Sequence, residues 1–157
     1  MKANGEERIS RLKAEFFQGF VQTCGIQLVS LEHGRAESRL EITEAHSQQD
    51  GFVHAGVMAA MADHTAGYAA FSVVTEDFRI LTLEFKINFL RPATGKHLVC
   101  RARVVKQGRK ILVADSELFD QRDGAEKLAA KALVTLMAVP ANTFGAQLAA
   151  DRARSRQ

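Results

Sequence analysis

Asp63 is the residue best placed to do chemistry, since no other Asp, Glu, Lys or Arg lies between His54 and Glu76. It stands within a run of Ala, Met and Gly, where aspartate has poor helix propensity. A buried carboxylate costs several kcal/mol unless it is paired or hydrogen-bonded, which makes Asp63 a functional candidate. The alternative to a functional role is that the helix has one solvent-exposed face, on which Asp63 lies and bonds to His64 or Thr65.

A second candidate group lies at the start of the same run, where His54 follows a glycine-containing loop at residues 50–53. The N-terminus of a helix presents free backbone N–H groups and the positive end of the helix dipole. His54, Ala55 and Gly56 can therefore hold an oxyanion or polarise a carbonyl group. The alternative is that His54 is only a capping or core histidine.

The spacing between these two groups has a consequence for the assembly. On a helix, nine residues correspond to about 13–14 Å of rise, and nine steps of 100° place the two side chains on opposite faces. One chain is therefore not expected to bring His54 and Asp63 to the same reacting atom. If they act together, the site is shared between two chains, so the spacing predicts a homo-oligomer.

The net charge of +3 is concentrated in one segment, since residues 91–110 hold seven basic side chains and no acidic one. The seven are Arg91, Lys96, Arg101, Arg103, Lys106, Arg109 and Lys110. Such a segment is expected to meet an anion. A nucleic acid is disfavoured, because aromatic side chains are not interleaved with the basic ones and the chain has no Trp and a single Tyr.

Two helices are expected to position these groups. Apolar side chains at spacings of three and four predict an amphipathic helix over residues 5–20, with Ile9, Leu12, Phe16 and Phe20 on one stripe. Residues 55–74 are small and apolar on nearly all sides, which predicts a helix buried in a core. A membrane span is disfavoured there, because a charged group such as that of Asp63 is costly in a bilayer.

Strands account for most of the remaining chain. From Leu81 to Phe89, apolar residues alternate with polar ones, a period of two that is typical of a strand. Five further strands are expected at 26–31, 35–42, 98–105, 111–119 and 127–139. Short antiparallel strands bury such a helix only if the sheet curls around it, which predicts an α+β fold with a curved antiparallel sheet around the central helix. The exposed edge of this sheet invites pairing with a second copy.

Length and composition bound the class of protein. A chain of 157 residues, 46% hydrophobic and 25% charged, fits one globular domain, expected at 1–140 with a tail at 141–157. Its two cysteines fit no zinc spacing and no disulfide framework, so we expect no metal site and a reducing cytoplasm. The polar N-terminus resembles no signal peptide.

Three segments carry a family resemblance: Gly-Phe-Val-His-Ala-Gly at 51–56, Ala-Asp-His-Thr-Ala-Gly at 62–67 and Asn-Phe-Leu-Arg-Pro-Ala at 88–93. In this order and spacing they resemble the hotdog-fold acyl-CoA thioesterases of the PaaI type, over roughly residues 20–139. The resemblance implies a hotdog sheet around the helix, dimers joined as one continuous sheet and often tetramers. It also implies hydrolysis of an acyl-CoA to a free acid and CoA. No cofactor is expected, because water supplies the nucleophile.

The resemblance also assigns roles to the candidate residues. It implies that Asp63 is the catalytic carboxylate, acting as a general base on water or as a nucleophile. The Ala55 N–H is expected to bind the thioester oxygen, and His54 to polarise or position that carbonyl. Here His-Ala-Gly, ending at Gly56, replaces the His-Gly-Gly of the family. Ala55 keeps the backbone N–H of the glycine it replaces but adds a methyl group.

Two further site residues follow from the resemblance. Gln48 falls where members often place an Asn that contacts the water or the thioester, and Thr82 where some use a Ser or Thr near the carboxylate. The side chain of Gln48 is longer than that of Asn, so Gln49 and Asp50 are alternatives for the first role.

The resemblance gives the basic segment a partner, namely the phosphates of CoA. In the family, the loop after the long strand and the turn between the next two strands approach the nucleotide. The corresponding residues are Arg91, Pro92, Lys106, Gly108, Arg109 and Lys110. Arg suits phosphate through its forked donors, and Lys acts as a point charge. Arg101 and Arg103 alternate with apolar residues and are expected to face water.

Alternatives remain for both the reaction and the acyl site. The chain is also compatible with a hotdog enoyl-CoA hydratase or dehydratase, and with a non-catalytic acyl-CoA-binding protein. Phe16, Phe17 and Phe20 either line an acyl tunnel or only pack the N-terminal helix on the sheet. Tyr68 and His64 are further candidates for that tunnel.

Overall fold

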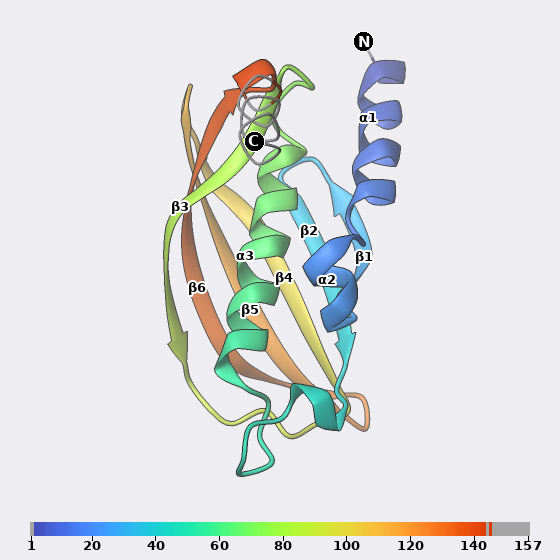
Figure 1. Cartoon of the computed structure of the whole chain (residues 1–157), viewed down its shortest axis with the longest axis vertical. Helices are drawn as coiled ribbons and strands as arrows, with labels where there is room; N and C mark the ends of the chain where they lie inside the picture. The colour runs from blue at the N-terminus through green and yellow to red at the C-terminus, as the bar shows by residue number, and fades with distance from the viewer. Residues whose placement is uncertain (1, 144, 146–157) are drawn as a thin grey trace, which may run out of the picture.

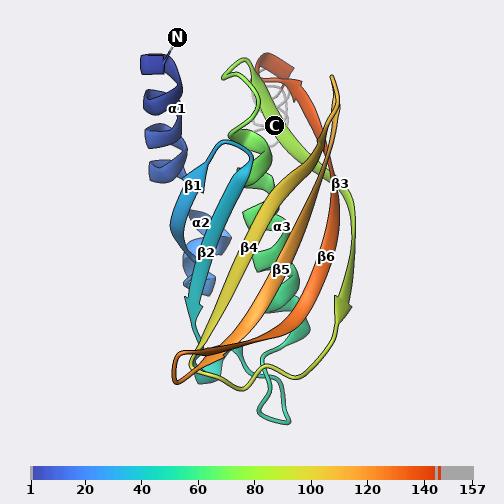
Figure 2. The ribbon, with the colours of Figure 1, turned by 180° about the vertical axis from the view of Figure 1, so that it is seen from behind.

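In the computed structural model, which describes residues 2–143 and 145, six antiparallel strands form one curved sheet in the order β1-β2-β4-β5-β6-β3. The strands are β1 (Gln27–Glu32), β2 (Arg35–Glu41), β3 (Phe78–Phe89), β4 (His97–Gln107), β5 (Ile111–Arg122) and β6 (Ala125–Pro140). The helices are α1 (Lys2–Glu15), α2 (Gly19–Cys24), the short 3-10 turn η1 (Glu44–His46) and α3 (Ala55–Phe71). The sheet wraps around α3 (Figures 1 and 2), which confirms the predicted hotdog architecture.

The central helix α3 lies on the concave face of the sheet and contacts all six strands. Its buried side is made mostly of alanine and methionine, and its residues are Met58, Met61, Ala62, Thr65, Ala66, Ala69 and Ala70. The helix ends at Phe71, three residues before the expected end. Ser72 is the C-cap, and its hydroxyl donates to the Ala69 carbonyl and accepts from the Gly34 N–H, both at 2.7 Å.

The expected N-terminal helix is present as α1, but its predicted end at residue 20 is wrong, because α1 ends at Glu15 and a break separates it from α2. Gln18 is extended and Gly19 has a φ of +54°, a left-handed conformation that ends a continuous helix. Phe16 therefore turns into the core and is 1% exposed, whereas Phe20 is 68% exposed and leaves the predicted stripe. The predicted tail at 141–157 lies almost entirely outside the described residues.

A β-bulge in β3 breaks the alternation that the sequence predicts there. Thr82 lies opposite Leu136 and Glu84 opposite Thr135, so Leu83 is an extra residue. Residues opposite each other share a face, and Leu136 and Val134 are both fully buried, so Thr82 and Phe85 face α3. A strict period of two would have placed Leu81 there instead. The bulge thus turns the Thr82 hydroxyl toward the helix.

β3 is an edge strand of the sheet and leaves apolar side chains uncovered. Leu81, Leu83, Phe85 and Phe89 are between 37% and 50% exposed. An unpaired, apolar edge of this kind is a template for pairing with another strand. Within the described residues, no helix combines the length and apolarity that a membrane crossing requires.

An aromatic cluster holds the junction of α1 and α2 on α3. The Phe16 ring meets the His64 ring at 4.5 Å and the Tyr68 ring at 4.8 Å between centroids. The His64 imidazole also bonds to the Phe16 carbonyl at 3.1 Å. Burial raises the pKa of Tyr68 to about 12. For Phe16, these contacts favour the packing role over an acyl tunnel.

His64 is expected to make folding stability depend on pH. Burial lowers the pKa of this imidazole, although the Phe16 carbonyl and Asp63 oppose the shift. Below the ordinary value of 6.5, the unfolded chain therefore takes up a proton that the folded chain does not. Stability then falls as the pH drops from about 7.5 to 5.5. Urea unfolding of the wild type and of His64→Gln at both pH values measures this effect, and an equal loss in the two proteins would contradict it.

Candidate active site

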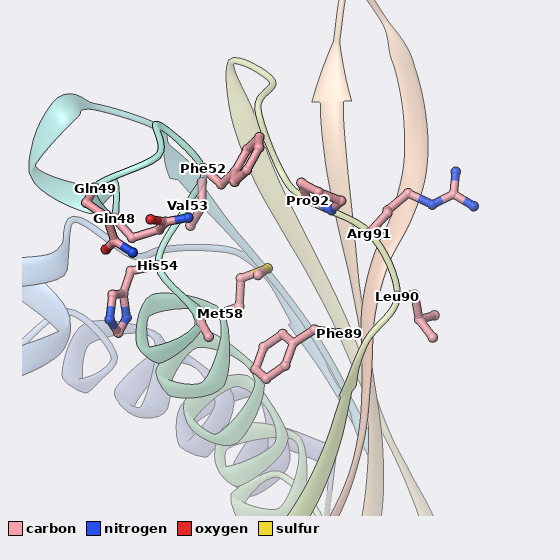
Figure 3. A pocket seen from close by; sticks show the side chains of 11 residues that line it. Gln48, Gln49, Phe52, Val53, His54, Met58, Phe89, Leu90, Arg91 and Pro92 are labelled. Carbon is pink, nitrogen blue, oxygen red and sulfur yellow. The ribbon is translucent and has the colours of Figure 1, made fainter.

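A cavity of about 560 Å³ opens where the N-terminus of α3 meets the loop that follows β3 (Figure 3). Its polar lining consists of Gln48, Gln49, His54 and Arg91. The other lining residues form an apolar wall, which includes Phe52, Met58, Phe89 and Leu90. A mostly apolar lining with a few polar groups is the usual form of a small-molecule site.

Backbone hydrogen bonds fix the loop that carries this lining. The Gln48 N–H donates to the Phe52 carbonyl at 2.8 Å, and Gly51, with a φ of +81°, makes the turn between them. The Val53 N–H donates to the Ala93 carbonyl at 3.0 Å, which ties the loop to the segment after β3. The entry to α3 is therefore held from both sides.

The N-terminus of α3 presents the geometry expected of an oxyanion site. The His54 Nδ1 accepts from the Gly56 N–H at 2.9 Å, so His54 does cap the helix and its proton lies on Nε2. Among the hydrogen bonds of the described residues, none uses the Ala55 N–H. This N–H, at the positive end of the helix dipole, is thus available to a ligand oxygen.

The glycine at position 56 is explained by the same cap. A Cβ atom on Gly56 would lie 3.0 Å from Nδ1 and 3.3 Å from Cε1 of the His54 ring. A larger residue would push the ring from the helix end. Alanine at position 55 of the motif keeps the N–H donor, whereas a methyl group at position 56 would force the His54 ring to shift by a few tenths of an ångström.

Asp63 forms a separate half of the predicted site. It is half-buried, and its Oδ1 accepts a hydrogen bond from the Thr82 hydroxyl at 2.7 Å. Its partner is neither His64 nor Thr65, which bond to the carbonyls of Phe16 and Met61. Of the residues that the structure describes, those lining the cavity at His54 include neither Asp63 nor Thr82. The expectation that one chain keeps His54 and Asp63 apart is therefore met.

Of the three candidates for the water-positioning role, Gln48 and Gln49 line the cavity, whereas Asp50 does not. The side-chain oxygen of Gln48 accepts from the Asp50 N–H at 2.7 Å. The NH₂ group of Gln48 is then what remains for a ligand. Asp50 instead shapes the turn.

The basic residues fall into three places rather than one. Arg91 and Pro92 lie at the rim of the cavity, where the Arg91 side chain extends outward (Figure 3). The turn at 106–110 lies at the far end of β4, about 35 Å along the strand from its start near that rim. Lys106, Gly108, Arg109 and Lys110 therefore do not join Arg91 within one chain.

Arg101 and Arg103 lie on the outer face of the sheet, as expected. Arg101 pairs with Glu126 at 2.7 Å and with Glu37 at 2.9 Å. Arg103 pairs with Asp115 at 3.0 Å. Carboxylates on β2, β5 and β6 therefore neutralise both charges.

Comparison with known proteins decides the family. Residues 50–127 match the model of the Thioesterase superfamily. A 1,4-dihydroxy-2-naphthoyl-CoA hydrolase of Listeria monocytogenes is 30% identical over 67% of this chain and 85% of its own length. The chain belongs to the thioesterase superfamily. It is a thioester hydrolase by family, and the predicted PaaI-type resemblance is consistent with this membership.

Solved structures share the fold. A thioesterase family protein of Silicibacter pomeroyi is 40% identical with a TM-score of 0.81, over 84% of this chain and 98% of that one. The PaaI protein of E. coli is 21% identical with a TM-score of 0.75, over 87% and 94% of the two chains, a likeness of fold alone. The match to the thioesterase model spans His54, Asp63 and Thr82.

Sequence reasoning missed the apolar wall of the cavity. Phe52, Phe89 and Leu90 stand inside the recognised motifs, yet they were not assigned to the site. Met58 follows His54 by four residues, so both lie on one side of the helix. That spacing was the available signal, but burial in the core explains a helical Met equally well.

Proposed function

We propose that this chain is an acyl-CoA thioesterase whose sites each combine the His54 cavity of one chain with Asp63 and Thr82 of another. The observation that carries the proposal is the division of the site. The free Ala55 N–H at the positive end of α3 lines the cavity, whereas the carboxylate of Asp63, bonded to the Thr82 hydroxyl, lies on the same helix but does not line it. In a thioesterase, these two halves supply what ester hydrolysis needs, an oxyanion site and a group that activates water.

The exposed edge of β3 supports a homodimer as the unit that completes the site. Thr82 lies on β3 itself, so a second copy that pairs with this strand comes next to the Asp63 half. Such pairing would cover Leu83 and Phe85 and satisfy the free backbone groups of the edge. Two antiparallel copies would also bring the 106–110 turn of one chain to the end that holds Arg91 of the other.

The reaction then follows from the two halves. The thioester carbonyl oxygen accepts from the Ala55 N–H, and the Nε2–H of His54 polarises or positions it. Asp63 of the other chain takes a proton from water as the oxygen of that water attacks the carbonyl carbon, or attacks as a nucleophile itself. When water attacks, the intermediate expels the CoA thiolate, which takes up the proton, and leaves the free acid. When Asp63 attacks, loss of the thiolate leaves an anhydride between the acyl group and Asp63, which water then hydrolyses to the free acid. Because Thr82 occupies Oδ1, Oδ2 is the oxygen left for this step.

A thiol-release assay over a panel of acyl-CoAs tests the proposal. We expect one free thiol and one free acid per substrate consumed. An enoyl-CoA in the panel separates the alternatives, since a hydratase would leave the thioester intact and release no thiol. Tight binding without turnover over the whole panel would contradict an enzyme and favour a binding protein.

Arg91 is expected to contribute binding of CoA rather than chemistry. Arg91→Ala should raise the KM for acyl-CoA about fivefold, equivalent to ~1 kcal/mol, with little change in kcat. Salt should likewise raise the wild-type KM more than it lowers turnover. Lys13→Ala, which removes one positive charge from α1, is the control. Equal KM values for the two variants would contradict the phosphate contact.

The proposed location is the cytoplasm. Cys24 and Cys100 are both free thiols, and Cys100 is fully buried. Burial raises the pKa of the Cys100 thiol to about 12. A reducing compartment would keep both in this state.

A further inference from the structure

A group of hydroxyl side chains is buried between α3 and the sheet, in a core that is mostly apolar. Ser38 on β2, Thr65 on α3 and Ser116 on β5 are each 0% exposed. Ser38 and Thr65 bond to each other at 2.7 Å, and Thr65 also donates to the Met61 carbonyl at 2.6 Å. Buried hydroxyls cost stability unless they are bonded, and all three are.

The bond of Ser116 differs from the others in what it holds. Its hydroxyl donates to the Ala62 carbonyl at 2.8 Å. This carbonyl and the Asp63 N–H belong to one planar peptide unit, so a bond to the carbonyl fixes the plane from which Asp63 projects. A helical carbonyl already accepts a hydrogen bond from the N–H four residues later. The Ser116 hydroxyl donates to the second lone pair of the Ala62 carbonyl oxygen.

Asp63 is thus held at two points by one sheet. Ser116, from β5, holds its peptide plane, and Thr82, from β3, holds its carboxylate at 2.7 Å. Both strands flank β6 in the sheet. The position of the carboxylate is therefore set by the sheet and not by the helix alone.

We propose that Ser116 is a positioning residue for Asp63, which orients the turn of α3 that presents the carboxylate to the reacting atom. The proposal rests on the proposed function, in which Asp63 does the chemistry. A small misplacement of a catalytic group lowers the rate more than it lowers substrate binding. Loss of the Ser116 hydroxyl should then act on kcat.

The chain offers a matched control in Ser38. Ser38→Ala removes a hydroxyl of equal burial, but the acceptor it leaves is the Thr65 hydroxyl, which keeps its bond to Met61. We expect Ser116→Ala to lower kcat about tenfold with KM within about twofold. Ser38→Ala should lower the midpoint of urea unfolding about as much as Ser116→Ala does, yet leave kcat within about twofold of the wild-type value. Ser116→Cys and Ser38→Cys give the same comparison if an alanine variant does not fold.

A double variant completes the test. In the Asp63→Asn background, Ser116→Ala should change the residual kcat by less than about twofold, because the carboxylate it positions is gone. Equal losses of kcat in Ser116→Ala and Ser38→Ala, or the full tenfold loss in the Asp63→Asn background, would overturn the proposal. An unchanged kcat in Asp63→Asn alone would contradict the proposed function, and the positioning role with it.

Discussion

Asp63→Asn is expected to lower kcat for acyl-CoA hydrolysis about a thousandfold, with KM within about twofold. Asparagine keeps the size of the side chain, and its oxygen still accepts from the Thr82 hydroxyl. The charge and basicity that activate water are lost. Steady-state thiol release at saturating substrate measures the change, and urea unfolding checks that the variant folds as the wild type does.

Asp77→Asn is the matched control for this change. Asp77 also accepts a hydrogen bond from a threonine hydroxyl, that of Thr75 at 3.3 Å, but it is exposed and lies in the loop between α3 and β3. Its replacement should leave kcat within about twofold. A kcat for Asp63→Asn that equals that of Asp77→Asn would rule out Asp63 as the catalytic carboxylate.

Two inactive variants are expected to restore activity when they share a dimer. His54→Ala removes one half of each site and Asp63→Asn the other, so a heterodimer carries one intact site and one doubly altered site. In an equal mixture refolded together, about half of the dimers are heterodimers, and about a quarter of the wild-type activity should return. Thiol release before and after refolding measures the recovery.

The control for this experiment pairs two variants of the same half. Asp63→Asn and Thr82→Val both alter the carboxylate side, so no heterodimer between them contains an intact site. Activity of this mixture should stay at the level of the separate variants. Recovery in both mixtures, or in neither, would contradict a site that is shared between chains.

The fold was largely predictable, because burial leaves a clear pattern. The apolar run at 55–74 and the alternating runs required a helix within a curled sheet, and the comparisons confirm that architecture. The Asp123-Gly124 hairpin was predictable as well. Both residues take left-handed backbone, with φ of 51° and 79°, which is the turn that this dipeptide favours.

Other features were out of reach because they depend on tertiary geometry. The pairing of Thr82 with Asp63 followed from the resemblance, but the bulge that makes it possible did not, since Leu81 and Leu83 are both apolar and hide the change of phase. The break before Gly19 accompanies the burial of Phe16 against His64, a contact between residues far apart in the sequence. The separation of Arg91 from the 106–110 turn depends on the length of β4, which charge counting ignores.

The bulge at Leu83 also bears on how this gene can change. Loss of that single codon would restore a strict alternation and keep Phe85, Ile87 and Phe89 on the same face as Thr82, because Leu83 is the extra residue. Loss of a paired residue such as Lys86 would instead turn the residues after it to the opposite face. Natural variants of β3 should therefore exchange amino acids freely at position 83, or lack that residue, but conserve the number of paired residues from Phe85 to Phe89.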